Sequence, residues 1–166
     1  ASKSTPTGAV AKFATGGKKT YKKNMGLMSM SYGYVYVASV ALGADRGQTL
    51  KAFQEAEAYN GPSIIFAYAP CIAHGIDMSK TQTEQKRAVD AGYFPLYRYN
   101  PENPEAPFTW DAKEPKGNFQ DFIKSEGRYK SLMKTNPSEA EALYEQAEKD
   151  AATRMSVFKA VGELLK

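Results

Sequence analysis

The feature that most constrains the fold is an alternation of helical segments and strand-like runs in the first half of the chain. Residues 34–40 are dense in aromatic and β-branched side chains, and residues 63–68 form a short apolar run, typical of a strand buried on both faces of a parallel sheet. A helix capped by Asn24 precedes the first run, and a helix capped by Asp45 separates the two runs and ends at residues 60–62. This αβαβ order requires a right-handed crossover, so it predicts an α/β fold with a parallel sheet flanked by helices.

The helix after Asp45 carries apolar residues at spacings near the helical period. Leu50 and Phe53 belong to this set, with Ala56 and Ala58, while charged residues occupy most of the other side. The pattern predicts an amphipathic helix whose apolar face contains Leu50 and Phe53.

The second half of the chain predicts an αβ extension that ends in a long helix. Residues 79–91 predict a mostly polar helix, residues 94–99 a short strand, and residues 108–111 an edge strand that pairs back as a hairpin. Residues 118–130 predict one or two irregular helical turns, and residues 136–165 predict the long helix. One apolar stripe marks this helix and requires a partner surface: Ala140, Leu143, Tyr144, Ala147, Ala151, Met155, Phe158 and Val161.

Length and composition are those of one domain with no membrane role. The chain has 166 residues, of which 42% are hydrophobic. The longest apolar stretch, residues 34–42, is far shorter than the roughly 20 residues that span a bilayer. The start shows no basic and apolar leader, and a single cysteine cannot close an intrachain disulfide. We therefore expect a reducing compartment, the cytoplasm.

The basic charge is concentrated in the N-terminal segment, residues 1–24. The net charge is +4, yet the residues after 44 sum to −2. Six lysines and no acid lie before Asp45: Lys3, Lys12, Lys18, Lys19, Lys22 and Lys23. Lysines of this kind can contact phosphate, but the absence of arginine and the small amount of interleaved aromatic surface favour a solvated loop over a nucleic-acid site. Because the segment has few large apolar groups and does not begin with methionine, we expect the chain to be cut from something larger.

Cys71 and His74 are the only cysteine and the only histidine, and both follow the strand-like run 63–68. Ligands of open parallel α/β sheets bind beyond the carboxyl ends of the strands, which places both residues on the functional side. Three interpretations of Cys71 remain open on this ground: a buried small residue, a metal ligand whose partners lie elsewhere, or a thiol nucleophile paired with His74. For His74 by itself a hydrogen-bonded loop residue is favoured. Glycine-rich phosphate loops and nucleophile elbows are absent from the sequence.

Three motifs carry a family resemblance. They are residues 1–14 (Ala-Ser-Lys-Ser-Thr-Pro-Thr-Gly and onward), residues 26–38, and residues 61–75 with Tyr-Ala-Pro-Cys-Ile-Ala-His-Gly. The chain closely resembles the thiamine-diphosphate domain of pyruvate:ferredoxin (flavodoxin) oxidoreductases, strongly over residues 1–100 and in general character beyond them. The resemblance implies the second half of a thiamine-diphosphate-binding fold. It also implies an enzyme that converts pyruvate and coenzyme A to acetyl-CoA and carbon dioxide and passes electrons through 4Fe-4S clusters to ferredoxin or flavodoxin.

The resemblance also implies how cofactor ligands are divided. Cys71 corresponds to the fourth ligand of the 4Fe-4S cluster nearest the thiamine, and the other three cysteines lie far upstream in the family. The family's Gly-Asp-Gly motif for magnesium and diphosphate, and a strand ending in Asn-Thr-Gly-Gly-Gln, precede the position of Ala1. Ala73 stands where the family pattern has asparagine, which argues against a polar role at that position but not against the thiolate.

These implications predict a fragment with three parts and no catalytic residue of its own. Residues 1–24 are expected to form a basic loop between domains, residues 25–77 a partial thiamine-diphosphate core, and residues 78–166 the αβ extension, whose long helix contacts another domain or subunit. The expected partners are the remaining domains of the enzyme, a second copy in a homodimer, and ferredoxin or flavodoxin. The alternatives are a separately encoded α/β binding subunit and a thiol enzyme that uses Cys71 and His74.

Overall fold

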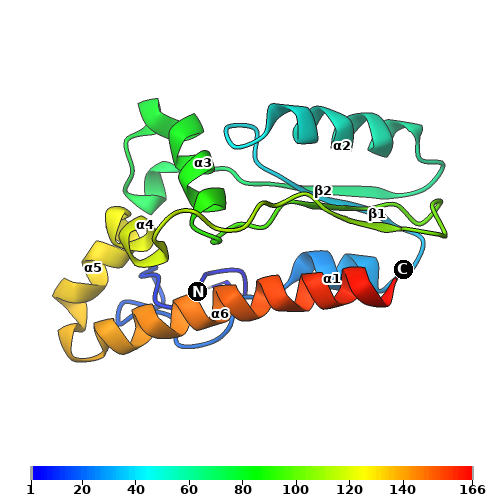
Figure 1. Ribbon diagram of the computed structural model, residues 1–166. Helices are drawn as coiled ribbons and strands as arrows, with labels where there is room; N and C mark the ends of the chain where they lie inside the picture. Colours follow the sequence, from blue (N-terminus) through cyan, green and yellow to red (C-terminus); the bar gives the residue numbers. More distant parts are fainter. Residues whose placement is uncertain (1, 166) are drawn as a thin grey trace.

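The computed structural model describes residues 2–165 and contains a mixed four-stranded sheet in the order β2-β1-β3-β4 (Figure 1). Strand β1 (Tyr36–Val40) pairs in parallel with β2 (Ser63–Ala67), as the αβαβ order predicts. On its other side β1 pairs antiparallel with β3 (Tyr97–Tyr99), which forms the predicted hairpin with β4 (Phe108–Trp110). The predicted parallel sheet is therefore parallel on one side of β1 and antiparallel on the other.

Helices cover both faces of this sheet. Helix α2 (Arg46–Ala58) lies over one face, and α1 (Met25–Met30) and α6 (Pro137–Leu164) lie under the other (Figure 1). Asn24 and Asp45 cap α1 and α2 as predicted, because each side chain accepts a hydrogen bond from a free backbone N–H in the first turn. No helix within residues 2–165 is long and apolar enough to cross a membrane.

Three more helices gather at the carboxyl end of β1 and β2 (Figure 1). They are α3 (Thr81–Asp90), α4 (Phe119–Ser125) and α5 (Gly127–Thr135), and two single-turn segments, η1 (Ile72–His74) and η2 (Met78–Lys80), precede α3. The polar helix after residue 79 and the irregular helical region around residues 118–130 are confirmed, the latter as two helices joined at Glu126.

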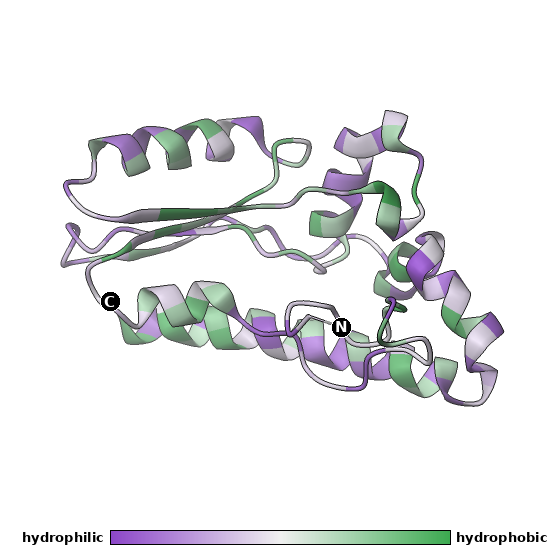
Figure 2. Cartoon of the chain, turned by 180° about the vertical axis from the view of Figure 1, so that it is seen from behind, coloured by the Kyte–Doolittle hydropathy of each residue, from purple (hydrophilic) through white to green (hydrophobic). Residues whose placement is uncertain are grey.

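Successive side chains of β1 point to opposite faces of the sheet, so each face packs against a different helical layer. Tyr36, Ala38 and Val40 pack with Ala52 of α2, whereas Val37 faces the opposite way and packs with Phe158 of α6. Figure 2 shows hydrophobic residues concentrated along the strands between the helical layers. The apolar stripe predicted for the long helix is confirmed, and the chain's own strands and helices cover it, since every stripe residue up to Phe158 is buried.

Two predictions about burial are wrong. Residues 63–68 do not form a strand buried on both faces: within the described chain β2 is an edge strand, and Ser63 and Ile64 are exposed. The apolar face predicted for α2 is also largely uncovered: Leu50 is 61% and Phe53 54% exposed, and of this set Ala56 packs against the core. Helix α2 turns a different side, which includes Ala52, toward β1, because hydrophobic periodicity shows which side is apolar and not which side is covered.

A buried ion network joins α2 to the hairpin. The Arg98 guanidinium on β3 donates from Nε and Nη2 to the two carboxylate oxygens of Asp111, at 2.8 and 2.9 Å, and from Nη1 to Glu55 of α2. Tyr36 and Gln48 donate to the same two carboxylates. The Asp111 carboxylate beside the guanidinium raises the Arg98 pKa, so the network stays charged.

Replacing Arg98 should therefore destabilise the whole chain. Arg98→Met removes the cation but leaves two largely buried carboxylates, so we expect the free energy of unfolding to fall by about 3 kcal/mol. Urea denaturation measures the change. Lys159→Met, which breaks an exposed pair with Glu114, should cost below about 1 kcal/mol. Equal losses for the two variants would contradict a structural role for the Arg98 network.

Candidate functional site

Cys71 and His74 lie just past the carboxyl end of β2, as the sequence predicts. Cys71 is half-buried, has extended backbone geometry and precedes the single turn η1, whose last residue is His74. Gly75 ends this turn with a φ of 69°, a left-handed conformation that glycine adopts without strain. Gly75 is also so close to α5 that an added Cβ would lie 2.6 Å from the Cα of Gly127. This contact of two glycines holds the Cys71 turn against α5.

The structure gives no support to a thiol–histidine pair. Within residues 2–165 no hydrogen bond joins the Cys71 thiol to the His74 ring. The expectation that His74 is a hydrogen-bonded loop residue is also incorrect for its ring, because the buried Nδ1 atom has no hydrogen-bond partner in the described chain. Oε1 of Glu126 lies 3.9 Å from Nδ1.

Burial and two nearby cations favour the neutral form of the His74 ring. Burial lowers the pKa of His74 to about 4, and the nearby Arg128 and Lys22 act in the same direction. Glu126 is fully buried beside it, and burial raises the pKa of its carboxyl group. Arg128 donates from Nε to Glu126 at 2.5 Å and from Nη2 to the Tyr93 hydroxyl at 2.9 Å. Sequence reasoning missed this ion pair, because Glu126 and Arg128 lie far from His74 along the chain.

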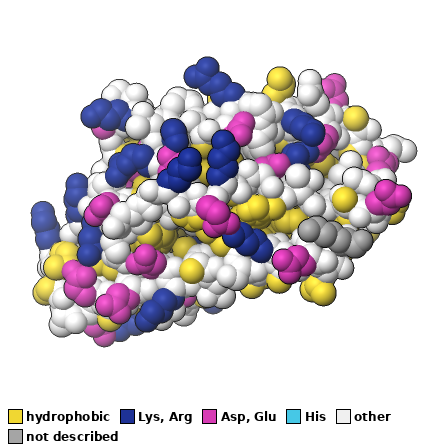
Figure 3. Space-filling model, in the orientation of Figure 1, with side chains coloured by type: hydrophobic (Ala, Val, Ile, Leu, Met, Phe, Trp, Pro, Cys, Tyr) yellow, Lys and Arg dark blue, Asp and Glu magenta, His cyan; other side chains and the backbone are white. Residues whose placement is uncertain are grey.

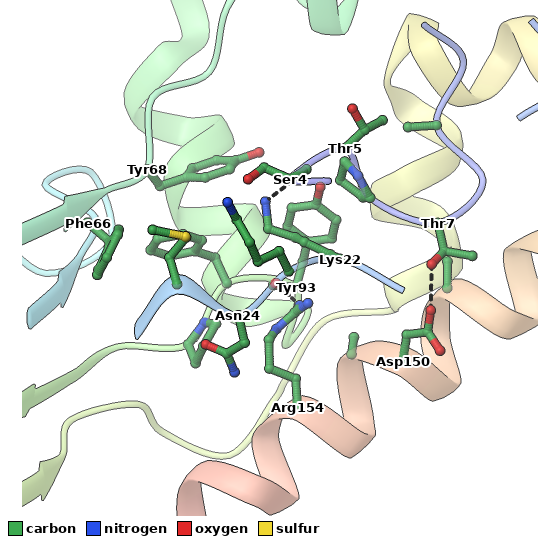
Figure 4. Close-up of a pocket in the computed structure, with 18 of the residues that line it drawn as sticks. Ser4, Thr5, Thr7, Lys22, Asn24, Phe66, Tyr68, Tyr93, Asp150 and Arg154 are labelled. Carbon is green, nitrogen blue, oxygen red and sulfur yellow. Dashed lines mark hydrogen bonds between the residues drawn. The ribbon is translucent and has the colours of Figure 1, made fainter. Parts of the chain in front are cut away.

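A cavity of about 760 Å³ adjoins this cluster. Strand β2, the start of α1 and helix α6 line it together with residues of the N-terminal segment, and Figure 4 shows side chains from all of these regions around one space. On the face of Figure 3, hydrophobic side chains gather in a hollow that runs across the middle of the molecule, above α6. The carboxyl end of β2 therefore borders a space of the size that small organic ligands occupy.

The N-terminal segment is packed more tightly than a solvated loop. Ala9 is buried in the main core, and the backbone N–H of Val10 donates to the carbonyl of Arg128. Lys18 is buried, and its Nζ donates to the carbonyls of Lys3 and Thr5. The expectation of a fully solvated lysine-rich loop is wrong for Lys18, although four of the six lysines are exposed.

No metal site is complete within the described chain. Residues 2–165 contain no group of three or more histidine, cysteine, aspartate or glutamate side chains placed to hold a metal ion. Cys71 is half-buried, and the residues described here do not gather further ligand side chains around it.

Comparison with known proteins finds close similarity along nearly the whole chain. It is 57% identical over 165 residues to pyruvate:ferredoxin oxidoreductase of Moorella thermoacetica and 52% identical over 163 residues to pyruvate-flavodoxin oxidoreductase of Klebsiella pneumoniae. It is also 46% identical over 164 residues to the mitochondrial pyruvate dehydrogenase [NADP(+)] of Euglena gracilis. The chain spans only 14% of the length of the first two relatives and 9% of the third. No family model matches the chain. The family resemblance inferred from the motifs is confirmed.

The low pKa of His74 predicts a specific dependence of stability on pH. Between about pH 6.5 and pH 4 the unfolded chain binds a proton on this ring that the folded chain does not, so stability should fall as the pH falls through that window. The loss attributable to His74 is at most about 3 kcal/mol. Urea unfolding near pH 7 and near pH 4.5 should show a larger loss for the wild type than for His74→Gln, which keeps the other titrating groups. NMR titration of this single histidine with a midpoint near 6.5 would contradict the prediction.

Proposed function

We propose that the chain is one segment of a pyruvate:ferredoxin or pyruvate:flavodoxin oxidoreductase and is inactive by itself. The observation that carries the proposal is 41–57% identity, over about 95% of this chain, to enzymes with these names, of which it matches only one part. The complete enzyme would convert pyruvate and coenzyme A to acetyl-CoA and carbon dioxide and pass electrons through 4Fe-4S clusters to its acceptor. A homodimer and a cytoplasmic location are parts of the same proposal.

Cys71 is the proposed contribution of this chain to a 4Fe-4S cluster. A thiolate is the required ligand type, and Cys71 lies half-buried on a turn that the contact of Gly75 with Gly127 holds in place. Three further thiolates would come from polypeptide outside this chain. The cluster, when bound, supplies one-electron transfer, and the chain's own role is to hold one sulfur at the carboxyl end of β2.

Magnesium and the thiamine diphosphate would be held mainly by residues upstream of Ala1. Residues 25–77 would complete part of the thiamine-diphosphate fold, and residues 78–166 would form its extension. In the N-terminal segment, Phe13 is 82% exposed, which suits a contact with a neighbouring domain. This division of the chain is part of the proposal.

Uncovered apolar groups support the view that other domains pack on this chain. β2 has an unpaired outer edge among the described strands, and Ile64 on it is exposed. Leu50 and Phe53 expose a further apolar surface on α2. Long apolar edge strands are aggregation hazards that natural proteins cover, so these surfaces suit burial by the remaining domains.

The cluster assignment can be tested in the intact parent enzyme. Cys71→Ser replaces the sulfur by a hydroxyl, so we expect electron paramagnetic resonance to show the selective loss or alteration of one 4Fe-4S signal, with turnover reduced in parallel. Ile72→Ser is the matched control, because Ile72 is 81% exposed and adjacent in the same turn. Normal signals from every cluster and normal turnover in Cys71→Ser would remove the assignment.

If another domain covers Leu50 and Phe53 on α2, substitutions there should affect stability in the complete enzyme but not in the 166-residue chain. In the 166-residue chain, Leu50→Glu combined with Phe53→Glu should change the free energy of unfolding by less than about 0.5 kcal/mol, because both side chains are exposed. In the parent enzyme the same double substitution should reduce the soluble yield or the melting temperature, because charges would be buried in an interface. Ala52→Glu, at a fully buried position, should destabilise both proteins. A parent enzyme that tolerates the double substitution unchanged would show that no domain covers α2.

A further inference from the structure

The turn that carries Cys71 is attached at both of its ends to two adjacent residues, Glu126 and Gly127. Tyr68, which directly follows β2, donates from its hydroxyl to Oε1 of Glu126 at 3.4 Å. Beyond the turn, the backbone N–H of Gly127 donates to the carbonyl of Gly75 at 3.2 Å. Glu126 and Gly127 stand where α4 ends and α5 begins. The residues between Tyr68 and Gly75 therefore span two attachments that lie at one point of the chain.

The Glu126 attachment point is itself held in place. Glu126 is fully buried, and its Oε2 accepts a hydrogen bond from Nε of Arg128 at 2.5 Å. Its backbone N–H donates to the carbonyl of Ile123 at 3.1 Å. A buried carboxylate that is paired and hydrogen-bonded has little freedom to move, because any displacement would leave a charge without its partner. The junction of α4 and α5 is thus a fixed support for the turn.

At the other attachment the two backbones are in direct contact. A Cβ added to Gly127 would lie 2.9 Å from the Cα of Gly75 and 3.3 Å from its carbonyl oxygen. Gly75 has a left-handed backbone, which by itself favours glycine, but Gly127 does not have a positive φ. Glycine is therefore required at position 127 by the close approach of Gly75 and not by the conformation of its own backbone.

The position of Gly75 is transmitted to Cys71 through the backbone of the turn. The N–H of His74 donates to the carbonyl of Cys71, and the N–H of Gly75 donates to the carbonyl of Ile72, both at 2.9 Å. These two overlapping hydrogen bonds make residues 71–75 one small rigid unit, so a displacement of Gly75 moves Cys71 as well. The hydrogen bonds and the solvent exposure of a ligating sulfur influence the reduction potential of an iron–sulfur cluster.

We propose that Gly127 is a positioning residue for the Cys71 sulfur: its backbone contact with Gly75 determines where the turn stands, while Glu126 holds the Tyr68 end. The inference rests on the proposed role of Cys71 as a cluster ligand and adds the residue that places this ligand. Gly127 acts only through the turn.

The test uses the intact parent enzyme with Gly127→Ala. The added Cβ must separate from the Cα of Gly75 from 2.9 Å to an ordinary carbon–carbon contact of about 3.5 Å, so the turn should move by roughly half an ångström. We expect a shift in the g-values and the midpoint potential of the one 4Fe-4S cluster whose signal Cys71→Ser alters, measured by electron paramagnetic resonance during a redox titration. The other clusters should keep their values. A defect of stability alone would lower the melting temperature and leave the g-values unchanged.

Two further variants complete the design. Gly47→Ala is the matched control, because it also adds a Cβ in the first turn of a helix but meets no atom closer than 3.5 Å, and it should leave every cluster signal unchanged. Tyr68→Phe removes the hydroxyl that reaches Glu126 and keeps the ring among its aromatic neighbours, so we expect a smaller shift in the same cluster. If Gly127→Ala does not assemble, the presence or absence of this smaller shift decides the question.

The outcomes separate the positioning role from the ligand assignment. Loss of one signal in Cys71→Ser together with unchanged g-values and potential in a folded Gly127→Ala would overturn the positioning role and leave the ligand assignment standing. Normal signals from every cluster in Cys71→Ser would remove both. A shift that Gly47→Ala reproduces, or that affects all clusters alike, would also contradict the inference, because it would reflect a general disturbance of the enzyme.

Discussion

The buried guanidinium of Arg98 is the contact on which the arrangement of the sheet depends. It stands on β3 at the register position of Ala38, so it faces α2, and it holds Asp111 beyond β4 and Glu55 of α2 at once. Without a cation at this point, two carboxylates would be buried with no counter-charge, which folded proteins rarely tolerate. The network therefore couples the position of the antiparallel hairpin to the helix of the parallel crossover.

That coupling determines where the carboxyl end of the parallel pair lies relative to the rest of the chain. Beyond β2, Tyr68 packs against Tyr93 and Phe94, and Tyr93 packs against Phe122 of α4. This aromatic cluster connects the sheet to the second core formed by α3 to α6. The Cys71 turn, the Glu126–Arg128 pair and the cavity all lie where these two cores meet. The candidate site is thus positioned by packing and ion pairs that are distributed over most of the chain.

The fold and the site differ in how far they could be predicted. Asn24 and Asp45 were recognisable as caps because capping depends on one side chain and the first turn that follows it. The stripe of α6 was recognisable because it repeats along most of the helix. By contrast, Leu50 and Phe53 have the same helical periodicity but no covering element within the described chain. Periodicity reports the chemistry of a surface, and only the neighbouring elements decide whether that surface is buried.

The sequence by itself determined the order of strands and helices, the location of Cys71 past a strand, and the family resemblance, because these depend on local patterns and contiguous motifs. Only the tertiary structure decided that β2 is an edge strand, that β3 joins β1 antiparallel, and that His74 has a neutral, unpartnered ring. It also decided that Lys22 and Arg154 lie at one cavity. These two cations stand near opposite ends of the chain, so no local pattern links them, and only the folded chain shows that they line the same space.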